Sequence, residues 1–517
     1  MEEHAAARLA EPPPEGQGPL ELSLRRKAAL ALGPTLFVVT VLLPTPQGAA
    51  DAALAVGQPP IMPQVALGTL LWVLVWWVTE ALPLGLATLI VPLVFGLAGV
   101  LPWRTSLASY ADPIIWIFMA GFVLAAAFQK WGLSQRVSIA LALAYKGNNP
   151  KIAALFVACL PVFLLTVTGS ITASTTIVLP FVSAYLAALG LKKGSRYATG
   201  VMLALGQAAT AGAFLFLIST APNLVTKATV DAHAPLNPLT FADWLVVGTP
   251  MAVLGLLISW FVTFRLIPPE MQELSIDRPA LEATRRGLGT LSRGEWAVAS
   301  LLALAVLLWT LPSLVLVLAE ANPSLIPLAR ELAAHAPEAM PAVLVILLAG
   351  LVRVKGEPLL RWPEIARGID WNIVFLFGGG IALGAGLERS GFALWLSASA
   401  VPLLGASPSA FVLFAIAALI GFGLSYAASN TAAAIIACPL AATLAIGAGL
   451  NPIPPILAAG LASSISSALP STTPPMAIVH STGHIRIIDM LRVGIVADLL
   501  RLAALILIGP ALTSLVS

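Results

Sequence analysis

Long apolar segments joined by short polar loops occupy most of the chain after residue 27. A helix needs about 20 predominantly apolar residues to cross the hydrocarbon core of a bilayer, and most of these segments approach that length. We expect membrane spans over residues 27–46, 64–80, 84–101, 113–130, 244–265, 296–317, 340–352, 371–387 and 493–513. The apolar pattern therefore predicts an all-α, polytopic membrane protein.

Two further segments, residues 152–190 and 408–449, place a run of small polar residues between two apolar halves. Lys151 precedes the first segment and Lys192 follows it, so both of its ends prefer the cytoplasmic side of the membrane. Such a segment either crosses the membrane twice or enters it and turns back. Broken backbone at membrane depth is tolerated where it faces protein or a water-filled cavity. We favour a re-entrant hairpin, because the polar run has no charge, proline or asparagine of the kind that exposed loops favour.

Two other apolar segments are interrupted by threonine and proline. Residues 197–231 are interrupted at Ser219-Thr220-Ala221-Pro222-Asn223, and residues 455–485 at Ser471-Thr472-Thr473-Pro474-Pro475. Proline breaks the helix at these points. Each half of the chain then runs through three spans, a hairpin, a broken span and a last span, and the two halves begin on opposite sides of the membrane. This inverted-repeat pattern is typical of secondary transporters. We expect the repeats at residues 64–265 and 296–513, with a cytoplasmic linker at residues 266–295.

The composition argues against other classes of protein. Hydrophobic residues make up 59% of the 517 residues and charged residues only 10%, whereas soluble domains carry roughly 25% charged residues. The net charge of +3 gives no support for nucleic-acid binding. Cys159 and Cys438 lie in apolar segments and are expected to pack there, since no Cys/His cluster indicates a metal site or a disulfide. No organic cofactor is expected.

The N-terminal 26 residues differ from the rest of the chain. Residues 1–26 are acidic and rich in proline, and they lack the basic start and apolar core of a signal peptide. We therefore expect a disordered tail. The basic cluster Arg25-Arg26-Lys27 precedes the first span, and such clusters favour the cytoplasmic side. The sequence predicts a cytoplasmic N-terminus in a multi-pass protein of the cell (plasma) membrane, surrounded by the lipid bilayer.

The four interruptions are expected to meet and to bind a small anion. A helix that begins at a break presents free N–H groups and the positive end of its dipole, which attract anions without arginine. The candidate donors are Ser170, Thr172, Ser429, Asn430 and Thr431 at the hairpin tips, with Thr220 and Thr473 at the broken spans. No basic residue lies at these positions, which favours a dicarboxylate over a phosphorylated substrate. Close helix packing by small residues is the alternative explanation, but the two matching pairs favour a site.

Glu80 is a second candidate for function, because an acid within a membrane span is a functional hypothesis by default. It could carry protons. Its position between Trp77 and Pro83 favours a simpler role at the membrane interface.

Several motifs resemble the divalent-anion/sodium symporter family, the di- and tricarboxylate carriers also called INDY-type transporters. The matching stretches are WWVTEALPLG at 76–85, IFMAGFVLAAAFQKWGLSQR at 117–136, DWNIVFLFGGGIALGAGLERSG at 370–391, SNTAAAIIACPL at 429–440 and LPSTTPPMAIVHSTGHIRIIDMLRVG at 469–494. They are spread over most of the chain. The resemblance implies about eleven transmembrane helices plus two re-entrant hairpins, a homodimer, and an elevator motion of one region against a fixed scaffold.

The resemblance also implies which residues bind. Those for the dicarboxylate are Ser170, Ile171, Thr172, Thr220, Ser429, Asn430, Thr431, Thr473 and Pro474. Those for a sodium ion at the second tip are Ser425, Ala428, Asn430 and Thr472, some of them through backbone oxygens. A sodium ion at the first tip would rest on Thr166, Ser170 and Ser219.

The first tip departs from the family pattern, which is Ser-Asn-Thr at both tips. Ile171 occupies the middle position and offers no side-chain oxygen to a cation. The first break has Ala221 in place of a proline, and Met476 stands where an asparagine is common in the second half. We therefore expect the first sodium site to be weak or absent.

The function implied by the resemblance is sodium-coupled symport of dicarboxylates of the succinate, malate and fumarate class. A sodium-independent dicarboxylate exchanger on the same fold is an alternative that Ile171 favours. A sulfate carrier is another, because the family includes sulfate transporters. An enzyme is not expected, since no nucleophile–base pair or metal cluster lies in the spans. A channel is a further alternative, and a bilayer recording would distinguish it, because a channel carries ion currents well above the turnover of a carrier.

Overall fold

The structure is a computed structural model that describes residues 24–516, apart from residues 236–237, 275–277, 336, 338 and 406–407. Within these residues the chain is almost entirely helical, and two short strands, β1 (Arg353–Val354) and β2 (Glu357–Pro358), form an antiparallel pair. Ten of the described helices are long and apolar enough to cross a membrane, or eleven if α2 and α3, bent by 88°, form one span. The prediction of an all-α, polytopic membrane protein is therefore confirmed. The predicted N-terminal tail lies, up to residue 23, outside the described residues.

The long helices carry large apolar side chains on their outer faces. Exposed leucines include Leu307, Leu314 and Leu316 on α17 (Arg293–Ala321), and Leu499, Leu500 and Leu507 on α27 (Ile487–Thr513). Soluble proteins rarely expose apolar surface of this extent, whereas hydrocarbon chains of lipids accommodate it. The surface thus agrees with a protein that crosses the membrane many times.

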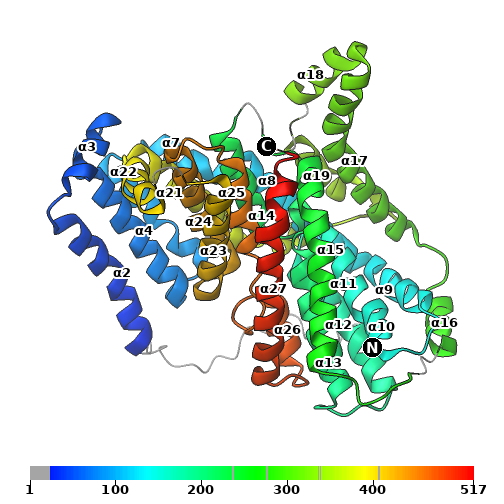
Figure 1. The fold of residues 1–517 in the computed structure, drawn as a ribbon. Coiled ribbons are helices and arrows are strands. Elements are labelled where there is room, and N and C mark those ends of the chain that lie inside the picture. The colour runs from blue at the N-terminus through cyan, green and yellow to red at the C-terminus, as the bar shows by residue number, and fades with distance from the viewer. Residues whose placement is uncertain are drawn as a thin grey trace, which may run out of the picture.

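The chain up to residue 144 forms a series of helices; in Figure 1 the first of them, in blue, lie on one side of the molecule and the last of them, in cyan, lies on the other side. They are α2 (Leu24–Leu42), α3 (Gln47–Ala55), α4 (Met62–Thr79), α5 (Leu84–Ala87), α6 (Ile90–Ala98), α7 (Trp103–Ala108), η1 (Ser109–Ala111), α8 (Pro113–Trp131) and α9 (Leu133–Ala144). Glu80 ends α4 in a left-handed conformation with φ 48° and has an exposed side chain. Its position at a helix end agrees with the expected interface role.

The first predicted hairpin consists of two antiparallel arms. The first arm comprises α10 (Pro150–Ala154), a π-helical turn η2 (Leu155–Cys159), α11 (Leu160–Leu165) and a 3₁₀ turn η3 (Thr166–Thr168), and the second arm is α12 (Ile171–Ala188). α11 and α12 pack against each other. Gly169 turns the chain with φ 92°, and a Cβ atom on it would lie 2.5 Å from the Cα atom of Gly121 on α8. Only glycine fits this turn, because both the φ angle and the close backbone contact exclude a side chain.

The first broken span is interrupted earlier than the sequence predicts. α13 (Arg196–Gly212) ends at Gly212, a short turn η4 (Leu217–Ser219) follows, and α14 (Ala221–His233) begins after Thr220. Pro222 lies in the first turn of α14, where its missing N–H is not needed. The proline thus starts the second helix rather than ending the first. α15 (Phe241–Leu266) completes this half.

The second half repeats the same kinds of element, with additions near its start. Its helices are α16 (Arg278–Gly287), α17, η5 (Pro323–Leu325), α18 (Ile326–His335), α19 (Ala339–Leu351), α20 (Trp362–Gly368), α21 (Trp371–Arg389), α22 (Phe392–Ala400), η6 (Val401–Leu404), α23 (Ala410–Ala427), α24 (Asn430–Gly447), α25 (Ile453–Ala462), α26 (Pro474–Ser481) and α27. α17 and α18 extend away from the other helices in Figure 1. The second hairpin consists of α23 and α24, which pack side by side.

The second broken span has a longer gap than expected. α25 ends at Ala462 and α26 begins at Pro474, so residues 463–473 are not helical. Residues 463–468 are nevertheless fully buried. Buried backbone outside a helix must find other hydrogen-bond partners. In this segment Asp498 accepts from Ser467 N, Gln207 donates to Ser467 O, and Arg501 donates to Ile465 O.

The two halves meet through the helices that follow their breaks. α14 packs against α24 and α25, and α26 packs against α12 and α13. Small residues permit this close approach: Gly460 on α25 lies against Thr226, and Gly206 on α13 lies against Met476. α27, red in Figure 1, runs between α23 and α15 and contacts both. Each hairpin thus has the post-break helix of the opposite half as a neighbour.

Candidate functional site

The second tip gathers three side-chain oxygens. Asn430 is the first residue of α24, and its Oδ1 accepts hydrogen bonds from Ser466 Oγ at 3.0 Å and from Ser425 Oγ at 3.4 Å. Ser425 Oγ and Ser466 Oγ are 2.5 Å apart. Ser425 and Ser466 are fully buried and Asn430 is 9% exposed. We call these three residues the second-tip oxygen cluster.

The chemistry of this cluster fits a monovalent cation. Its oxygens are neutral and hard, and helices that break at membrane depth supply such ligands to sodium in transporters. Ala428, also expected at this site, ends α23 in an extended conformation with ψ −179°. Thr472 is buried, and its hydroxyl donates to Leu469 O at 2.7 Å within its own turn. The structure therefore joins Ser425 to Asn430 directly, but no hydrogen bond in the described chain joins Thr472 to them.

Ser466 was not among the residues predicted for the site. It lies in the buried segment between α25 and α26, 36 residues from Asn430. The stretch SSISS at residues 463–467 contains four serines between two apolar helices. This density of hydroxyls in an apolar environment is the signal that could have identified it.

The helices at the tips begin in the same way. Ser429 Oγ accepts from Ala432 N at 3.3 Å, and Ser170 Oγ accepts from Ala173 N at 3.1 Å. Both serines are therefore N-caps. A serine that accepts a backbone hydrogen bond still has its own hydroxyl hydrogen to donate. Each tip thus presents a hydroxyl donor at a helix N-terminus.

The helices at the breaks also share one geometry. Thr220 precedes α14 with φ −156° and ψ 155°, and Thr473 precedes α26 with φ −152° and ψ 141°. Neither side chain caps its helix. Thr473 Oγ1 is buried without a hydrogen-bond partner in the described chain. A buried hydroxyl without a partner is costly, so this atom is well suited to bind a ligand.

The first tip contacts the first break but has fewer free oxygens. Ser219 Oγ donates to Thr166 O at 3.2 Å, and Gly169 N donates to the same carbonyl at 3.0 Å. Thr166 Oγ1 donates to Phe163 O at 2.7 Å. Ile171 is 6% exposed and occupies the position that Asn430 has in the second half. The structure thus brings Thr166 and Ser219 together, but the apolar side chain of Ile171 leaves this tip without an amide.

Contacts between the tips are less direct than the sequence led us to expect. Within the described residues, no hydrogen bond joins the first tip to the second. The two halves approach through α12 with α26 and through α14 with α24, whose N-termini carry Thr172, Pro474 and Thr431. Each tip therefore lies on a helix that packs against the other half.

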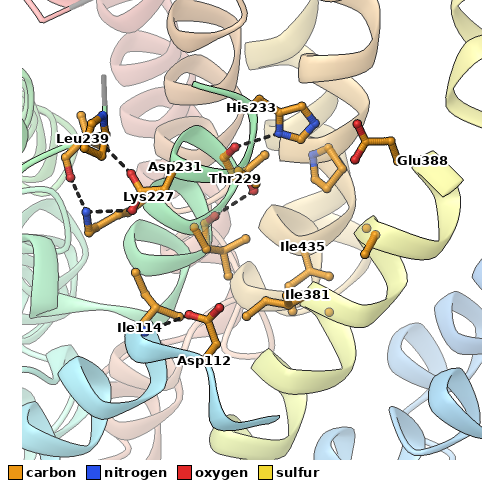
Figure 2. Close-up of a pocket in the computed structure, with 18 of the residues that line it drawn as sticks. Asp112, Ile114, Lys227, Thr229, Asp231, His233, Leu239, Ile381, Glu388 and Ile435 are labelled. Carbon is orange, nitrogen blue, oxygen red and sulfur yellow. Dashed lines mark hydrogen bonds and ion pairs between the residues drawn. The ribbon is translucent and has the colours of Figure 1, made fainter. Parts of the chain in front are cut away.

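A cavity of about 890 Å³ lies between α8, α14, α21 and α24 (Figure 2). None of the predicted binding residues lines it. Its ionisable lining includes an ion pair between Lys227 Nζ and Asp231 Oδ2 at 2.9 Å, together with Asp112 and Glu388. Acidic groups outnumber basic ones, and most of the wall is apolar. This lining fits a dicarboxylate poorly, so the tips remain the candidate site.

Comparison with known proteins assigns the chain to a family. Residues 26–516 match the sodium:sulfate symporter transmembrane region. The chain belongs to the sodium:sulfate symporter family. The match covers all the described helices from α3 onward and nearly all of α2. The predicted resemblance to sodium-coupled anion transporters is thereby confirmed, and so is the prediction of a transporter rather than an enzyme.

Two named transporters are similar to this protein along almost the whole chain. The sodium-dependent dicarboxylate transporter SdcS of Staphylococcus saprophyticus is 29% identical over 488 residues, which cover 93% of this chain and 90% of the relative. SdcS of Staphylococcus aureus is 28% identical over 491 residues, with coverage of 93% and 89%. A solved structure of MtrF from Neisseria gonorrhoeae, described among antimetabolite efflux pumps, has a TM-score of 0.52 at 15% identity and covers 80% of this chain and 84% of its own. The similarity to MtrF shows a common fold.

Two charged residues inside α27 were also missed by sequence reasoning. Asp498 and Arg501 lie in the last span of this symporter-family chain and are 0% and 2% exposed. Charged residues within a span indicate function or a specific partner, and the spacing of three residues places both on one face of the helix. The pair could therefore have been recognised from the sequence.

Proposed function

We propose that this protein is a secondary active transporter that carries C4 dicarboxylates of the succinate, malate and fumarate class together with sodium. The observation that carries the proposal is the second-tip oxygen cluster, in which Ser425, Asn430 and Ser466 converge at the start of α24. Its neutral oxygens suit sodium, and the adjoining helix N-terminus suits an anion. The similarity to transporters named as sodium-dependent dicarboxylate transporters supports the same function.

The proposed substrate site lies at the N-termini of α12, α14, α24 and α26. Hydroxyl groups at these positions donate to carboxylate oxygens, and the helix dipoles offset the negative charge. The proposed residues are Ser170, Ile171, Thr172, Thr220, Ser429, Asn430, Thr431, Thr473 and Pro474. The buried, unpartnered hydroxyl of Thr473 is the group best prepared to donate. The absence of lysine and arginine from this set favours carboxylates over phosphates.

The proposed sodium site uses the second-tip oxygen cluster with Ala428 and Thr472. A further sodium ion at Thr166, Ser170 and Ser219 has weaker support, because Ser219 and Gly169 already donate to the carbonyl oxygen of Thr166. Ile171 adds no oxygen there. We therefore propose one strong sodium site and at most one weak one.

The proposed mechanism is an elevator motion of two inverted repeats. The packing of α12 on α26 and of α14 on α24 supports a two-fold relation between the halves, because each pair joins a hairpin arm of one half to the post-break helix of the other. Re-entrant hairpins place both tips near the middle of the membrane, where the helix N-termini face the substrate. The hairpins then carry the bound substrate across as they move.

Uptake into proteoliposomes tests the proposed function. An inward sodium gradient is expected to stimulate uptake of labelled succinate, whereas an equal potassium gradient is not. If internal succinate stimulates uptake and sodium does not, the protein is an exchanger, the second candidate, which Ile171 favours. Unlabelled sulfate added outside distinguishes substrates, because a sulfate carrier loses its succinate signal at low sulfate concentration.

Replacing Ile171 with asparagine is expected to strengthen the response to sodium. The substitution gives the first tip the amide oxygen that Asn430 supplies at the second. The sodium concentration for half-maximal uptake should fall severalfold and the dependence on sodium should become steeper. Ile171→Val is the matched control, because it keeps an apolar side chain in this buried position. A sodium response of Ile171→Asn equal to that of the valine variant would contradict our account of the first tip.

A further inference from the structure

Asp498 and Arg501 form a buried ion pair in the middle of the protein. Arg501 Nη1 lies 3.4 Å from Asp498 Oδ1, one turn apart on α27. Removing both charges from water is costly, and this attraction alone rarely repays the cost. Further hydrogen bonds are needed to satisfy the remaining polar atoms, and their partners come from other helices and from the non-helical gap between α25 and α26.

The carboxylate of Asp498 binds two separate segments near the second tip. Its Oδ2 accepts from Tyr426 Oη at 2.6 Å and from Ser467 N at 2.6 Å. Its Oδ1 accepts from Ser467 Oγ at 2.5 Å. Tyr426 lies in the last turn of α23, and Ser467 lies in the buried gap between α25 and α26. A single side chain thus fastens both segments to α27.

These two segments are the ones that build the second-tip oxygen cluster. Tyr426 directly follows Ser425, and Ser467 directly follows Ser466. Ser466 lies outside any helix, so the position of its hydroxyl group depends on the hydrogen bonds that neighbouring residues make. The hydrogen bonds of Asp498 therefore fix the separation between Ser425 and Ser466, which both contact Asn430 Oδ1.

Arg501 connects α27 and the second-tip oxygen cluster to the first half of the protein. Its Nη2 donates to Gln207 O at 3.0 Å and to Gln207 Oε1 at 2.9 Å, and also to Ser259 Oγ. Gln207 lies on α13 and Ser259 on α15. Ser467 Oγ lies 2.8 Å from Gln207 Oε1. Ser467 is therefore held from both sides, by Asp498 and by Gln207.

We propose that Asp498 is a positioning residue for the cation at the second tip, acting through Tyr426 and Ser467. This inference rests on the proposed sodium-coupled function. Asp498 does not touch the cation; it holds the two walls of the second-tip oxygen cluster at the spacing that sodium requires. A purely structural ion pair would affect the stability of the protein and leave the sodium requirement of uptake unchanged. A change in the sodium requirement therefore distinguishes a positioning role from a structural one.

Tyr426→Phe is the main variant, because it removes one hydrogen bond to Asp498 and keeps the ring and the ion pair. In proteoliposomes, the sodium concentration for half-maximal succinate uptake should rise about tenfold, as expected for losing a hydrogen bond to a charged group. The succinate concentration for half-maximal uptake at saturating sodium should stay unchanged. Ser467→Ala should act in the same direction.

Tyr185→Phe is the matched control. The hydroxyl of Tyr185 is also buried and bonds to Tyr197 Oη at 3.1 Å in the first half, so its loss should leave the sodium requirement unchanged. Protection against thermal unfolding by sodium, measured in detergent, gives a second readout that does not depend on transport. It should require more sodium in Tyr426→Phe than in the control.

Three results would overturn the inference, and they are distinguishable. If wild-type uptake ignores sodium, the proposed function fails and the inference fails with it. If wild-type uptake needs sodium but Tyr426→Phe and Ser467→Ala have the wild-type sodium requirement, only the inference fails. If these variants lose thermal stability and change the sodium and succinate requirements equally, the network is structural and the inference is wrong.

Discussion

Replacing Asn430 with alanine is expected to abolish sodium-driven succinate uptake, with a loss of at least about a hundredfold. The substitution removes an amide oxygen from the proposed cation site. It also removes the acceptor that lies 3.0 Å from the buried hydroxyl of Ser466, whereas Ser425 Oγ keeps Ser466 Oγ as a partner. Each buried donor left unpaired costs about 1–3 kcal/mol, and about 1.4 kcal/mol corresponds to a factor of ten in affinity. The loss of a cation ligand adds to the weaker pairing of the Ser466 hydroxyl, and together they produce the expected effect.

The measurement is initial uptake into proteoliposomes at saturating external sodium, with protein incorporation checked for each variant. Asn372→Ala is the matched control, because Asn372 has an exposed side chain at the start of α21. It should retain normal uptake. Normal uptake by Asn430→Ala would show that the second tip does not hold the site.

Replacing Arg501 with methionine should lower the free energy of unfolding by about 3–5 kcal/mol, because it leaves the buried carboxylate of Asp498 without its cation. The side chain of methionine is unbranched, flexible and of similar volume, so much of the packing is kept. Unfolding by denaturant in detergent measures the change. Arg492→Met, on the exposed side of the same helix, controls for the loss of a positive charge and should change stability little.

A double variant separates charge from shape in this region. Arg501→Met combined with Asp498→Asn removes both charges, and replacing both members of a buried pair is often nearly neutral. We expect it to recover much of the stability lost in Arg501→Met. A double variant as unstable as the single one would mean that the hydrogen bonds of Arg501 to Gln207 and Ser259, rather than its charge, hold the helices together.

The fold could be predicted largely from local properties of the chain. Apolar length identified the spans, and the charge-free segment at residues 152–190 with lysines at both ends indicated an antiparallel pair. The position of the breaks was less predictable. Prolines mark where α14 and α26 begin, but the preceding helices end eight or more residues earlier, where tertiary hydrogen bonds replace helical ones.

The candidate site was predicted where its residues adjoin a recognisable turn; elsewhere the sequence marks unusual polar residues but not the partners they contact. Ser429 and Asn430 stand at a tip that the sequence marks clearly. Ser466 and Asp498 reach the same region from positions 36 and 31 residues distant from their partners Asn430 and Ser467. Only the packing of α25 and α27 against α23 brings them together, and local sequence carries no information on that packing.

The contact between Gly169 at the first tip and Gly121 on α8 determines how easily the first tip can separate from α8. Gly121 and Gly169 meet through backbone atoms alone, so dispersion of about 0.1–0.2 kcal/mol per atom pair holds them, and no side chain interlocks across the contact. The second tip is fastened to α27 through Tyr426 and Ser467 instead. If the hairpins move as proposed, we expect α8 to be left behind at little cost and α27 to move together with the second hairpin.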